Sequence, residues 1–176
     1  MKRFFLGMLA LICAMEVSAQ TAEEMQASKA RTEKLMKLVQ PKDCGLEKVD
    51  ALTSAAAVAA AESIEITPLL QGMYYRSIGQ TEDGVTDVTV KKPTMAELEE
   101  LSARIGMQAT AVAAATKLVP EASKEVSGIK NPMKLKNPTQ SLKYAKDVLA
   151  ILGEESAFQV KAIADMIKTA STGNNL

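Results

Sequence analysis

The sequence predicts an all-α protein, a single-domain helical bundle or irregular helical array of five to six helices, with one irregular or β-hairpin-like insert. Two observations predict this class. Apolar residues recur at steps of three and four over most of the chain, which is the period of an amphipathic helix. Aromatic residues make up only 3% of the chain. A core must therefore be built from Leu, Ile, Val, Met and Ala, as suits helix pairs or a bundle.

The longest predicted helix runs from Thr94 to Val119, and the other elements are expected to pack along it. Thr94 can act as the N-cap, and Glu97 three residues later completes a T-x-x-E capping box. An apolar stripe follows, interrupted by the polar Gln108. Its members are Leu98, Leu101, Ile105, Val112, Ala115 and Val119. Pro120 is expected to end or kink this helix, because proline lacks the backbone N–H that a helix interior uses.

The first 19 residues have the composition of a bacterial-type secretory signal peptide. A basic start at Lys2 and Arg3 is followed by a short apolar core, and Val17-Ser18-Ala19 meets the small-residue rule before a cleavage site. We therefore expect an exported protein, periplasmic or secreted, that begins at Gln20. An uncleaved anchor is the first alternative, although the apolar run is shorter than the roughly 20 residues of a transmembrane helix. A lipoprotein with lipid on Cys13 is the second, although a bulky isoleucine precedes that cysteine.

The composition of the remaining chain limits its partners. Removing residues 1–19 takes two basic and one acidic residue from a balanced set of 21 and 21, so the net charge becomes about −1. No basic excess attracts nucleic acid or an anionic membrane by bulk charge. No later apolar run reaches spanning length without a charge, so no stable membrane insertion is expected after cleavage. A helical domain is predicted over residues 20–170, with a disordered tail at 171–176.

Two helices are predicted before the insert. Thr21-Ala22-Glu23-Glu24 is a second capping box, and the helix behind it ends before Pro41. One face of this helix carries Met25, Ser28, Thr32, Leu35 and Val39. The second helix, Lys48–Ile66, contains the run Ala57–Ala61, which is repeated letter for letter at Ala111–Ala115. The high helix propensity of alanine explains the repeat. Alternatively the two runs face each other, because small side chains let helices approach closely.

Residues 67–93 form the predicted insert. Thr67-Pro68 resembles a helix start, with threonine at the N-cap and proline in the first helical position, so a short separate helix is expected to reach about Gly79. Beyond it Asp83-Gly84 is a turn signal among valines and threonines. The stretch Ser77–Lys92 is therefore expected to be either a small β-hairpin or an ordered loop.

Two more helices are predicted after a linker. Gly128 is expected to stop a short helical continuation of the central helix. Residues 128–138 contain two Lys-Asn-Pro triplets and are interpreted as an extended basic linker, after which Asn137-Pro138 opens a helix. Gly153 is expected to close that helix, and a last helix is predicted over 154–169. The expected inner faces are Leu142, Ala145, Leu149 and Leu152 in the first, and Val160, Ile163 and Ile167 in the second.

The residue types present exclude the best-known catalytic sets. The chain contains no histidine, which excludes Ser-His-Asp and Cys-His catalysis and the histidine-containing zinc and di-iron sites. Cys44 alone remains after cleavage, so neither an internal disulfide nor a CxxC site can form. Cys44 is interpreted as a half-buried apolar residue in a loop, with a homodimer bridge or a reactive thiol as the alternatives.

The remaining chemical patterns are weak. Ser127-Gly128-Ile129-Lys130 matches S-x-x-K but lacks the K-T-G segment that accompanies it in hydrolases. The carboxylate pairs Glu62/Glu65 and Asp83/Asp87 are interpreted as solvated surface charge rather than as acid–base pairs. The sequence therefore predicts no catalytic residue, no cofactor and no metal site.

The predicted function is non-enzymatic: a scaffold, adaptor or accessory protein of the bacterial cell envelope that binds another protein. A periplasmic carrier or chaperone-like protein that holds an apolar ligand or an unfolded chain is the alternative, and an enzyme of unfamiliar type comes third. The partner-binding surface is predicted in the insert. Tyr74 and Tyr75 form the only aromatic pair after residue 19, and the strand-like run that contains Val88 and Val90 can pair with the strand edge of a partner.

Overall fold

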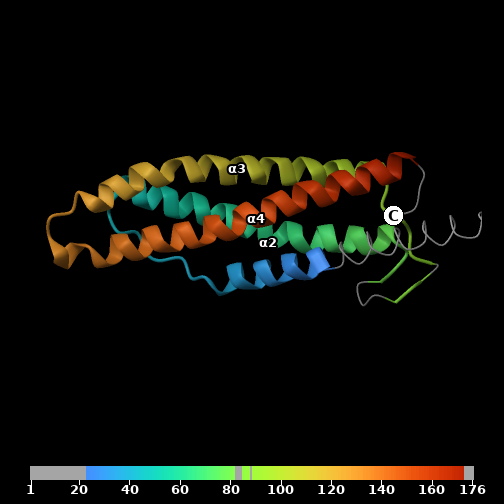
Figure 1. Ribbon diagram of the computed structural model, residues 1–176, viewed down its shortest axis with the longest axis horizontal. Helices are drawn as coiled ribbons and strands as arrows, with labels where there is room; N and C mark the ends of the chain where they lie inside the picture. The colour runs from blue at the N-terminus through green and yellow to red at the C-terminus, as the bar shows by residue number, and fades with distance from the viewer. Residues whose placement is uncertain (1–22, 82–84, 88, 173–176) are drawn as a thin grey trace, which may run out of the picture.

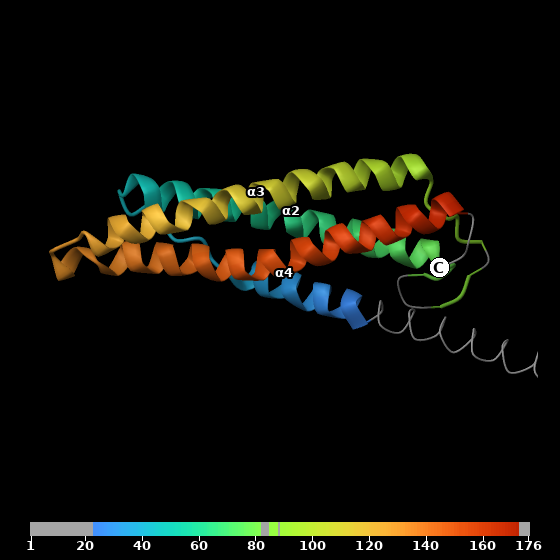
Figure 2. The same ribbon diagram turned by 45° about the horizontal axis from the view of Figure 1, so that its top comes forward.

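The computed structural model describes residues 23–81, 85–87 and 89–172, which form an all-helical bundle (Figures 1 and 2). Within these residues there are four α-helices and one turn of 3-10 helix. They are the N-terminal helix over residues 23–37, α2 (Glu47–Ser77), α3 (Met95–Ser127), η1 (Pro132–Lys134) and α4 (Lys136–Thr172). The predicted signal peptide, the cap at Thr21 and residues 173–176 of the predicted tail lie outside the described residues.

Three long helices make up the body of the molecule. α2, α3 and α4 each contact the other two, and α3 runs antiparallel to both (Figure 1). The N-terminal helix packs beside them over part of their length, and the extended segment 38–46 leads from its end to the start of α2 (Figures 1 and 2). The turn between α3 and α4 projects beyond the start of α2 in both views.

The predicted number of five to six helices is not confirmed, because helices continue through three residues that were expected to end them. Pro68 lies inside α2, Pro120 inside α3 and Gly153 inside α4, and all three are exposed. Proline in a helix interior costs about 3 kcal/mol and glycine about 1 kcal/mol. Burying one large apolar side chain contributes about 1.5–3 kcal/mol. Buried residues continue on both sides of each break, so packing outweighs these local costs.

The Thr67-Pro68 pair shows how a start signal fails inside a packed helix. Thr67 was expected to be an N-cap, but its hydroxyl donates to the carbonyl oxygen of Ser63, one turn earlier in the same helix, at 3.0 Å. Ile66 and Leu70 on the two sides are fully buried. α2 is therefore one helix where a helix over 48–66 and a second short helix were predicted.

The predicted start of α3 is confirmed. The hydroxyl of Thr94 accepts from the backbone N–H of Glu97 at 3.3 Å, and the carboxylate of Glu97 accepts from the N–H of Thr94 at 2.6 Å. The predicted apolar stripe is buried except for the half-buried Val119, and Gln108 is buried with it. The helix ends with Gly128 as its C-cap, as expected.

The predicted β-hairpin is not confirmed. Over the described part of residues 78–93 there is no strand, and one isolated antiparallel bridge joins Gln80 to Thr86. The backbone N–H of Thr81 also donates to the carbonyl oxygen of Val85 at 2.9 Å. The Asp83-Gly84 turn signal lies outside the described residues.

The linker between α3 and α4 is ordered by its own side chains. Asn131 accepts a hydrogen bond from the N–H of Met133 at 3.0 Å and so caps η1. α4 begins at Lys136, one residue before the predicted cap Asn137. Pro138 is tolerated because the first N–H groups of a helix need no partner within the helix. The predicted extended linker is thus a compact turn, which we call the tip and define as residues 128–138.

The core divides along the bundle into two apolar clusters. The tip-side cluster comprises Leu35, Val49, Leu52, Ala56, Ala59, Ala60, Val112, Ala115, Ala122, Val126, Leu142, Ala145, Val148, Leu149 and Leu152. The insert-side cluster comprises Met25, Ile66, Leu70, Tyr74, Leu98, Leu101, Ile105, Phe158, Ala162, Ile163 and Met166. Both alanine runs contribute to the tip-side cluster, through Ala59 and Ala60 in one run and Val112 and Ala115 in the other, while Val58 is 68% exposed.

Candidate functional site

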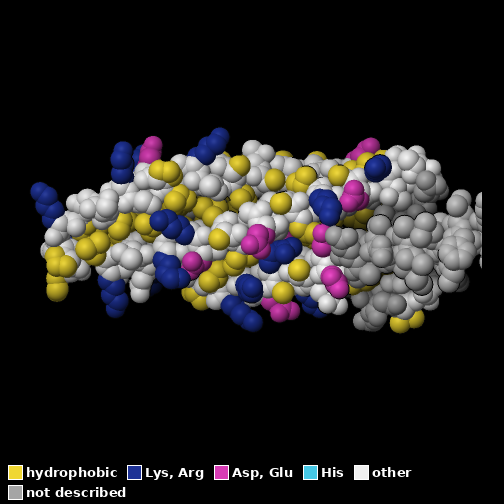
Figure 3. Space-filling view, in the orientation of Figure 1, with side chains coloured by type: hydrophobic (Ala, Val, Ile, Leu, Met, Phe, Trp, Pro, Cys, Tyr) yellow, Lys and Arg dark blue, Asp and Glu magenta, His cyan; other side chains and the backbone are white. Residues whose placement is uncertain are grey.

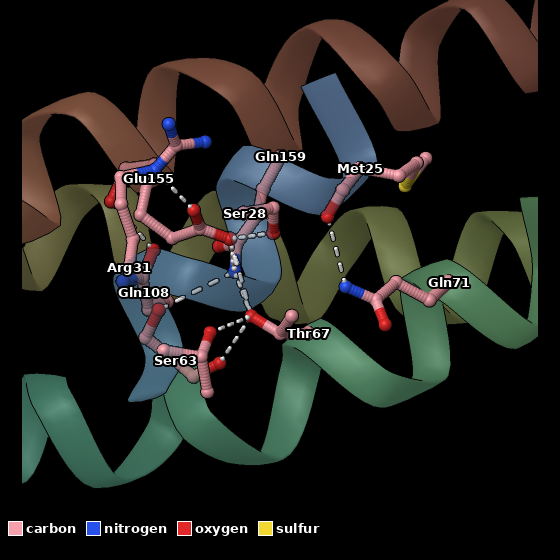
Figure 4. A network of polar contacts seen from close by, with 11 residues as sticks. Met25, Ser28, Arg31, Ser63, Thr67, Gln71, Gln108, Glu155 and Gln159 are labelled. Carbon is pink, nitrogen blue, oxygen red and sulfur yellow. Dashed lines mark hydrogen bonds and ion pairs between the residues drawn. The ribbon is translucent and has the colours of Figure 1, made fainter. Parts of the chain in front are cut away.

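A layer of buried polar side chains separates the two apolar clusters. On α2, α3 and α4 it lies where the residues of one cluster give way to those of the other, and the N-terminal helix also contributes to it (Figure 4). We call this set the polar layer. Its members are Ser28, Arg31, Thr32, Ser63, Thr67, Gln108, Glu155, Ser156 and Gln159, of which all but the half-buried Arg31 are buried.

Glu155 lies at the centre of the polar layer. Its side chain is fully buried and forms an ion pair with Arg31 at 2.7 Å. The same carboxylate accepts from the hydroxyl of Ser28 at 2.6 Å and lies 3.2 Å from the hydroxyl of Thr67, whose one proton it shares with the Ser63 carbonyl. The Arg31 guanidinium also lies over the Phe158 ring, 5.5 Å from its centroid, a geometry that attracts a cation. The N-terminal helix is thus attached to the bundle by a buried charge pair and by hydrogen bonds.

Glutamines extend the polar layer across the bundle. The Gln159 amide donates to Glu155 at 3.1 Å, to Thr67 at 3.2 Å and to Ser63 at 3.3 Å. On the α3 side the hydroxyl of Ser156 donates to the Gln108 side-chain oxygen at 3.0 Å. The polar layer therefore links all four helices at one level.

The chemistry open to the polar layer is limited by its burial. A general acid or base must come within hydrogen-bond reach of its substrate. Glu155 has no exposed surface and each of its oxygens already accepts hydrogen bonds from the protein. Ser28, which donates to it, is also fully buried. The arrangement suits a structural task, because a buried charged network permits one alignment of the helices and penalises others.

Sequence reasoning found only part of the polar layer. Ser28, Thr32 and Gln108 were placed on inward faces, whereas Glu155 and Gln159 were not singled out. The predicted break at Gly153 hid them. The inward face Leu142, Ala145, Leu149, Leu152 continues at steps of three and four to 155 and 159 when the helix is uninterrupted.

The predicted partner-binding residues of the insert lie in different environments. Tyr74 is 3% exposed and belongs to the insert-side cluster. Tyr75 is half-buried, and its ring meets that of Tyr74 edge to face with centroids 5.5 Å apart. Val90 is half-buried, and Val88 lies outside the described residues. Tyr75 and Val90 are thus partly accessible, and Val85 nearby is 62% exposed; a partner-binding surface here stays a prediction.

Cys44 is half-buried in the segment before α2, as the sequence indicated. Burial, followed by its hydrogen bond to Asp50, raises the pKa of the thiol, and this lowers the fraction of reactive thiolate. The Asp50 carboxylate accepts from the N–H groups of Cys44 at 2.8 Å and Gly45 at 2.9 Å. A bridge through Cys44 to a second chain stays a prediction.

The other chemical patterns in the sequence are surface features. Arg104 donates to Glu62 at 2.7 Å and to Glu65 at 3.0 Å, and these bonds raise the pKa of its guanidinium. The Ser127 hydroxyl donates to a backbone carbonyl and is exposed. Within residues 23–81, 85–87 and 89–172, no three His, Cys, Asp or Glu side chains are grouped to hold a metal ion. None of the helices described there is long and apolar enough to cross a membrane.

An open cleft lies where the tip meets the segment before α2. Its volume is about 550 Å³. Its lining is Cys44, Gly45, Leu46, Ile129, Met133, Lys134, Lys136, Asn137 and Pro138. In Figure 3 the extreme left end of the visible face carries hydrophobic and basic side chains, and the acidic ones on that face begin further along the body. This end of the molecule therefore combines apolar and positively charged surface.

Comparison of the chain with protein-family models, with curated proteins and with solved structures gave no match.

Proposed function

We propose that the protein is a non-enzymatic binding protein of the bacterial cell envelope, exported by way of residues 1–19, that serves as a scaffold or accessory protein for another macromolecule. The observation that supports this most is the polar layer. Its carboxylate and hydroxyl groups, the Gln108 side-chain oxygen and the Gln159 side-chain nitrogen are engaged with one another inside the bundle, away from the clefts at the two ends. The other atom of each amide, Gln108 Nε2 and Gln159 Oε1, is buried without a hydrogen-bond partner. The long helices then act as a rigid body that holds two different ends apart.

The two ends offer the surface on which a partner can be recognised. At one end Tyr75, Val85 and Val90 lie on or next to the irregular segment after α2. At the other end the tip presents Met133, which is 89% exposed. Loops held on a rigid scaffold are where binding function usually lies.

Site-specific photo-cross-linking in native envelopes tests this proposal. A photoreactive residue is placed at Tyr75, Val90 or Met133, and at Val58 or Met107 on the body as matched controls, which are 68% and 67% exposed. We expect a discrete adduct of one mass from an end position and none from the controls. Equal cross-linking from every position, or adducts from none, contradicts a scaffold function.

The carrier alternative requires a pocket that can hold an apolar ligand. A small-molecule site is usually an enclosed, mostly apolar pocket of about 300–1,000 Å³. The cleft beside the tip has a volume of about 550 Å³ but is open and carries two lysines. Saturable binding of an uncharged apolar dye, competed by apolar ligands, would favour the carrier over the scaffold.

A further inference from the structure

The tip lies in a stretch of the chain that carries positive charge and no negative charge. From Val126 to Lys146 the sequence has five lysines and no acidic residue. Lys143 is paired with Asp147. The three lysines of the tip, at positions 130, 134 and 136, are exposed, and no ion pair is found for them among the described residues.

Two of the acidic residues near the tip bind backbone groups at the start of α2 or in the segment before it. Glu125 accepts from the N–H groups of Lys48 at 2.9 Å and Val49 at 3.1 Å, and so caps α2. Asp50 binds the backbone of the segment before α2. Asp43 and Glu47 are exposed and flank residues 44–46, which line the side of the cleft opposite the tip. The tip itself is thus purely basic, although the mature chain as a whole is nearly neutral.

A protruding apolar residue accompanies this charge. Met133 is 89% exposed, and η1, on which it lies, contacts α4 but neither α2 nor α3. Besides the Asn131 cap, the backbone N–H of Lys134 donates to Asn131 at 3.0 Å and that of Leu135 to Pro132 at 3.2 Å. The tip is therefore preorganised, and presenting it to a surface requires little further ordering.

We propose that the tip docks the protein end-on to an anionic phospholipid bilayer, with Lys130, Lys134 and Lys136 among the headgroups and Met133 inserted between them. Basic residues next to an anionic surface are each attracted to it within a Debye length. A projecting methionine adds apolar area that a headgroup region can bury. The proposal rests on the proposed function only in that an envelope protein meets such surfaces.

The kind of basic residue favours a membrane over an acidic protein. Lysine is depleted and arginine enriched in protein–protein interfaces, because the planar guanidinium makes fixed bidentate contacts and the ammonium does not. The tip contains lysine alone. The three arginines of the described residues, Arg31, Arg76 and Arg104, are all engaged in ion pairs within the bundle. A flexible ammonium suits the diffuse charge of a lipid surface.

Vesicle co-sedimentation of the exported, purified protein tests the proposal. The vesicles are phosphatidylcholine alone, or phosphatidylcholine with one third phosphatidylglycerol. Each lysine near an anionic surface is expected to strengthen binding about fivefold. Three lysines therefore predict roughly 100-fold tighter partitioning to the anionic vesicles than to the neutral ones. Raising the salt to 1 M should abolish most of this difference, because the Debye length falls to about 3 Å.

Matched variants locate the contact. The triple variant Lys130→Gln, Lys134→Gln, Lys136→Gln should lose roughly 100-fold in partitioning. The control variant changes the net charge by the same amount on exposed positions of the N-terminal helix: Lys29→Gln, Lys34→Gln, Lys37→Gln. Its partitioning should fall by less than about fivefold, because it shares with the tip variant only the general effect of a lower net charge. Met133→Ser should lose about tenfold, whereas Met107→Ser, on the body, should leave partitioning unchanged.

Four results overturn the proposal: equal partitioning to neutral and anionic vesicles, equal effects of the two lysine triples, equal effects of the two methionine changes, or tip-dependent binding of polyglutamate without binding to vesicles. The last result would identify an acidic protein as the partner instead. Because purified lipid contains no protein partner, failure here leaves the cross-linking test of the scaffold function unaffected, and the reverse also holds. Thermal unfolding of each variant confirms that the exposed substitutions leave the fold intact.

Discussion

The two apolar clusters on either side of the polar layer are built from different residues. The tip-side cluster consists of Leu, Val and six alanines, whereas the insert-side cluster has one alanine and contains Met, Ile, Phe and Tyr. Small side chains let helix backbones approach one another, and larger ones hold them apart. The N-terminal helix contributes Met25 to the insert side and Leu35 to the tip side. We infer that alanine packing brings the helices close together in the tip-side half, while larger residues fill the space between them in the insert-side half.

We infer that the polar layer prevents the helices from sliding past one another. Apolar side chains are tolerant of small shifts, because they need contact but no particular partner. A buried carboxylate needs its partners in place, since removing one leaves an uncompensated charge. Glu155 draws its partners from the N-terminal helix and from α2. We infer that it sets the register of the bundle.

The largest expected effect comes from breaking the buried ion pair. Arg31→Leu leaves the Glu155 carboxylate buried without its cation, and we expect the free energy of unfolding in urea to fall by about 3–5 kcal/mol. Arg104→Leu removes an arginine that bridges two glutamates at the surface, and about 0–1 kcal/mol is expected. Equal losses of unfolding free energy would show that the buried ion pair contributes no more to stability than a surface pair.

A double variant separates the loss of the ion pair from the cost of leaving the Glu155 carboxylate buried without its cation. Arg31→Leu with Glu155→Leu removes both charges, and replacing a buried pair by apolar residues is often nearly neutral. We expect it to recover most of the stability lost by Arg31→Leu alone. No recovery would mean that the hydrogen bonds from Ser28, Thr67 and Gln159 matter more than the charge pair.

The next effect concerns the alanine packing of the tip side. Ala59, on α2, is 2% exposed, whereas Ala113, in the repeated run on α3, is exposed. Ala59→Leu should overpack the cluster and cost about 1–3 kcal/mol of unfolding free energy. Ala113→Leu is the matched control and should be nearly neutral in the same urea titration. If Ala59→Leu were also neutral, the helices would not be held close by small side chains.

The smallest expected effect is a pH dependence at the insert end. Hydrogen bonds from Arg76, and then from Thr94, lower the pKa of Glu97 from 4.5 to about 2. A carboxyl whose pKa is lower in the folded state stabilises the fold above its unfolded pKa. This contribution is complete above pH 4.5 and is lost as the pH falls towards 2. Glu97→Gln should therefore lower the urea midpoint at pH 6 and converge with the wild type near pH 2, and parallel curves would contradict the assignment.

Local features of this protein were predictable from the sequence because their partners lie within one turn of helix. The Thr94–Glu97 capping box, the stop at Gly128 and the inward faces of α3 and of the first half of α4 all follow from spacing alone. The helical class follows in the same way from the apolar period. These properties depend on backbone geometry, which neighbouring residues determine between themselves.

Continuity of the helices was decided by tertiary packing. Pro68, Pro120 and Gly153 are breakers by their local chemistry, and each lies exposed within a helix whose buried face continues past it. The start of α2 is likewise invisible in its own sequence, since Leu46 provides no side-chain cap and Glu125, 77 residues away from Lys48, supplies the acceptor. Burial of distant residues outweighs a local cost of about 1–3 kcal/mol.

The composition of residues 20–176 determined that the helical bundle is built with few aromatic side chains and no histidine. The tertiary structure alone decided which polar residues meet inside it. Ser28 and Glu155 are 127 positions apart in the sequence, yet the Ser28 hydroxyl lies 2.6 Å from the Glu155 carboxylate. The spacing of residues around either one does not predict this contact. Their meeting depends on the register of four helices. That register is a property of the whole packed core, because one step of sliding would leave a buried charge without its partner.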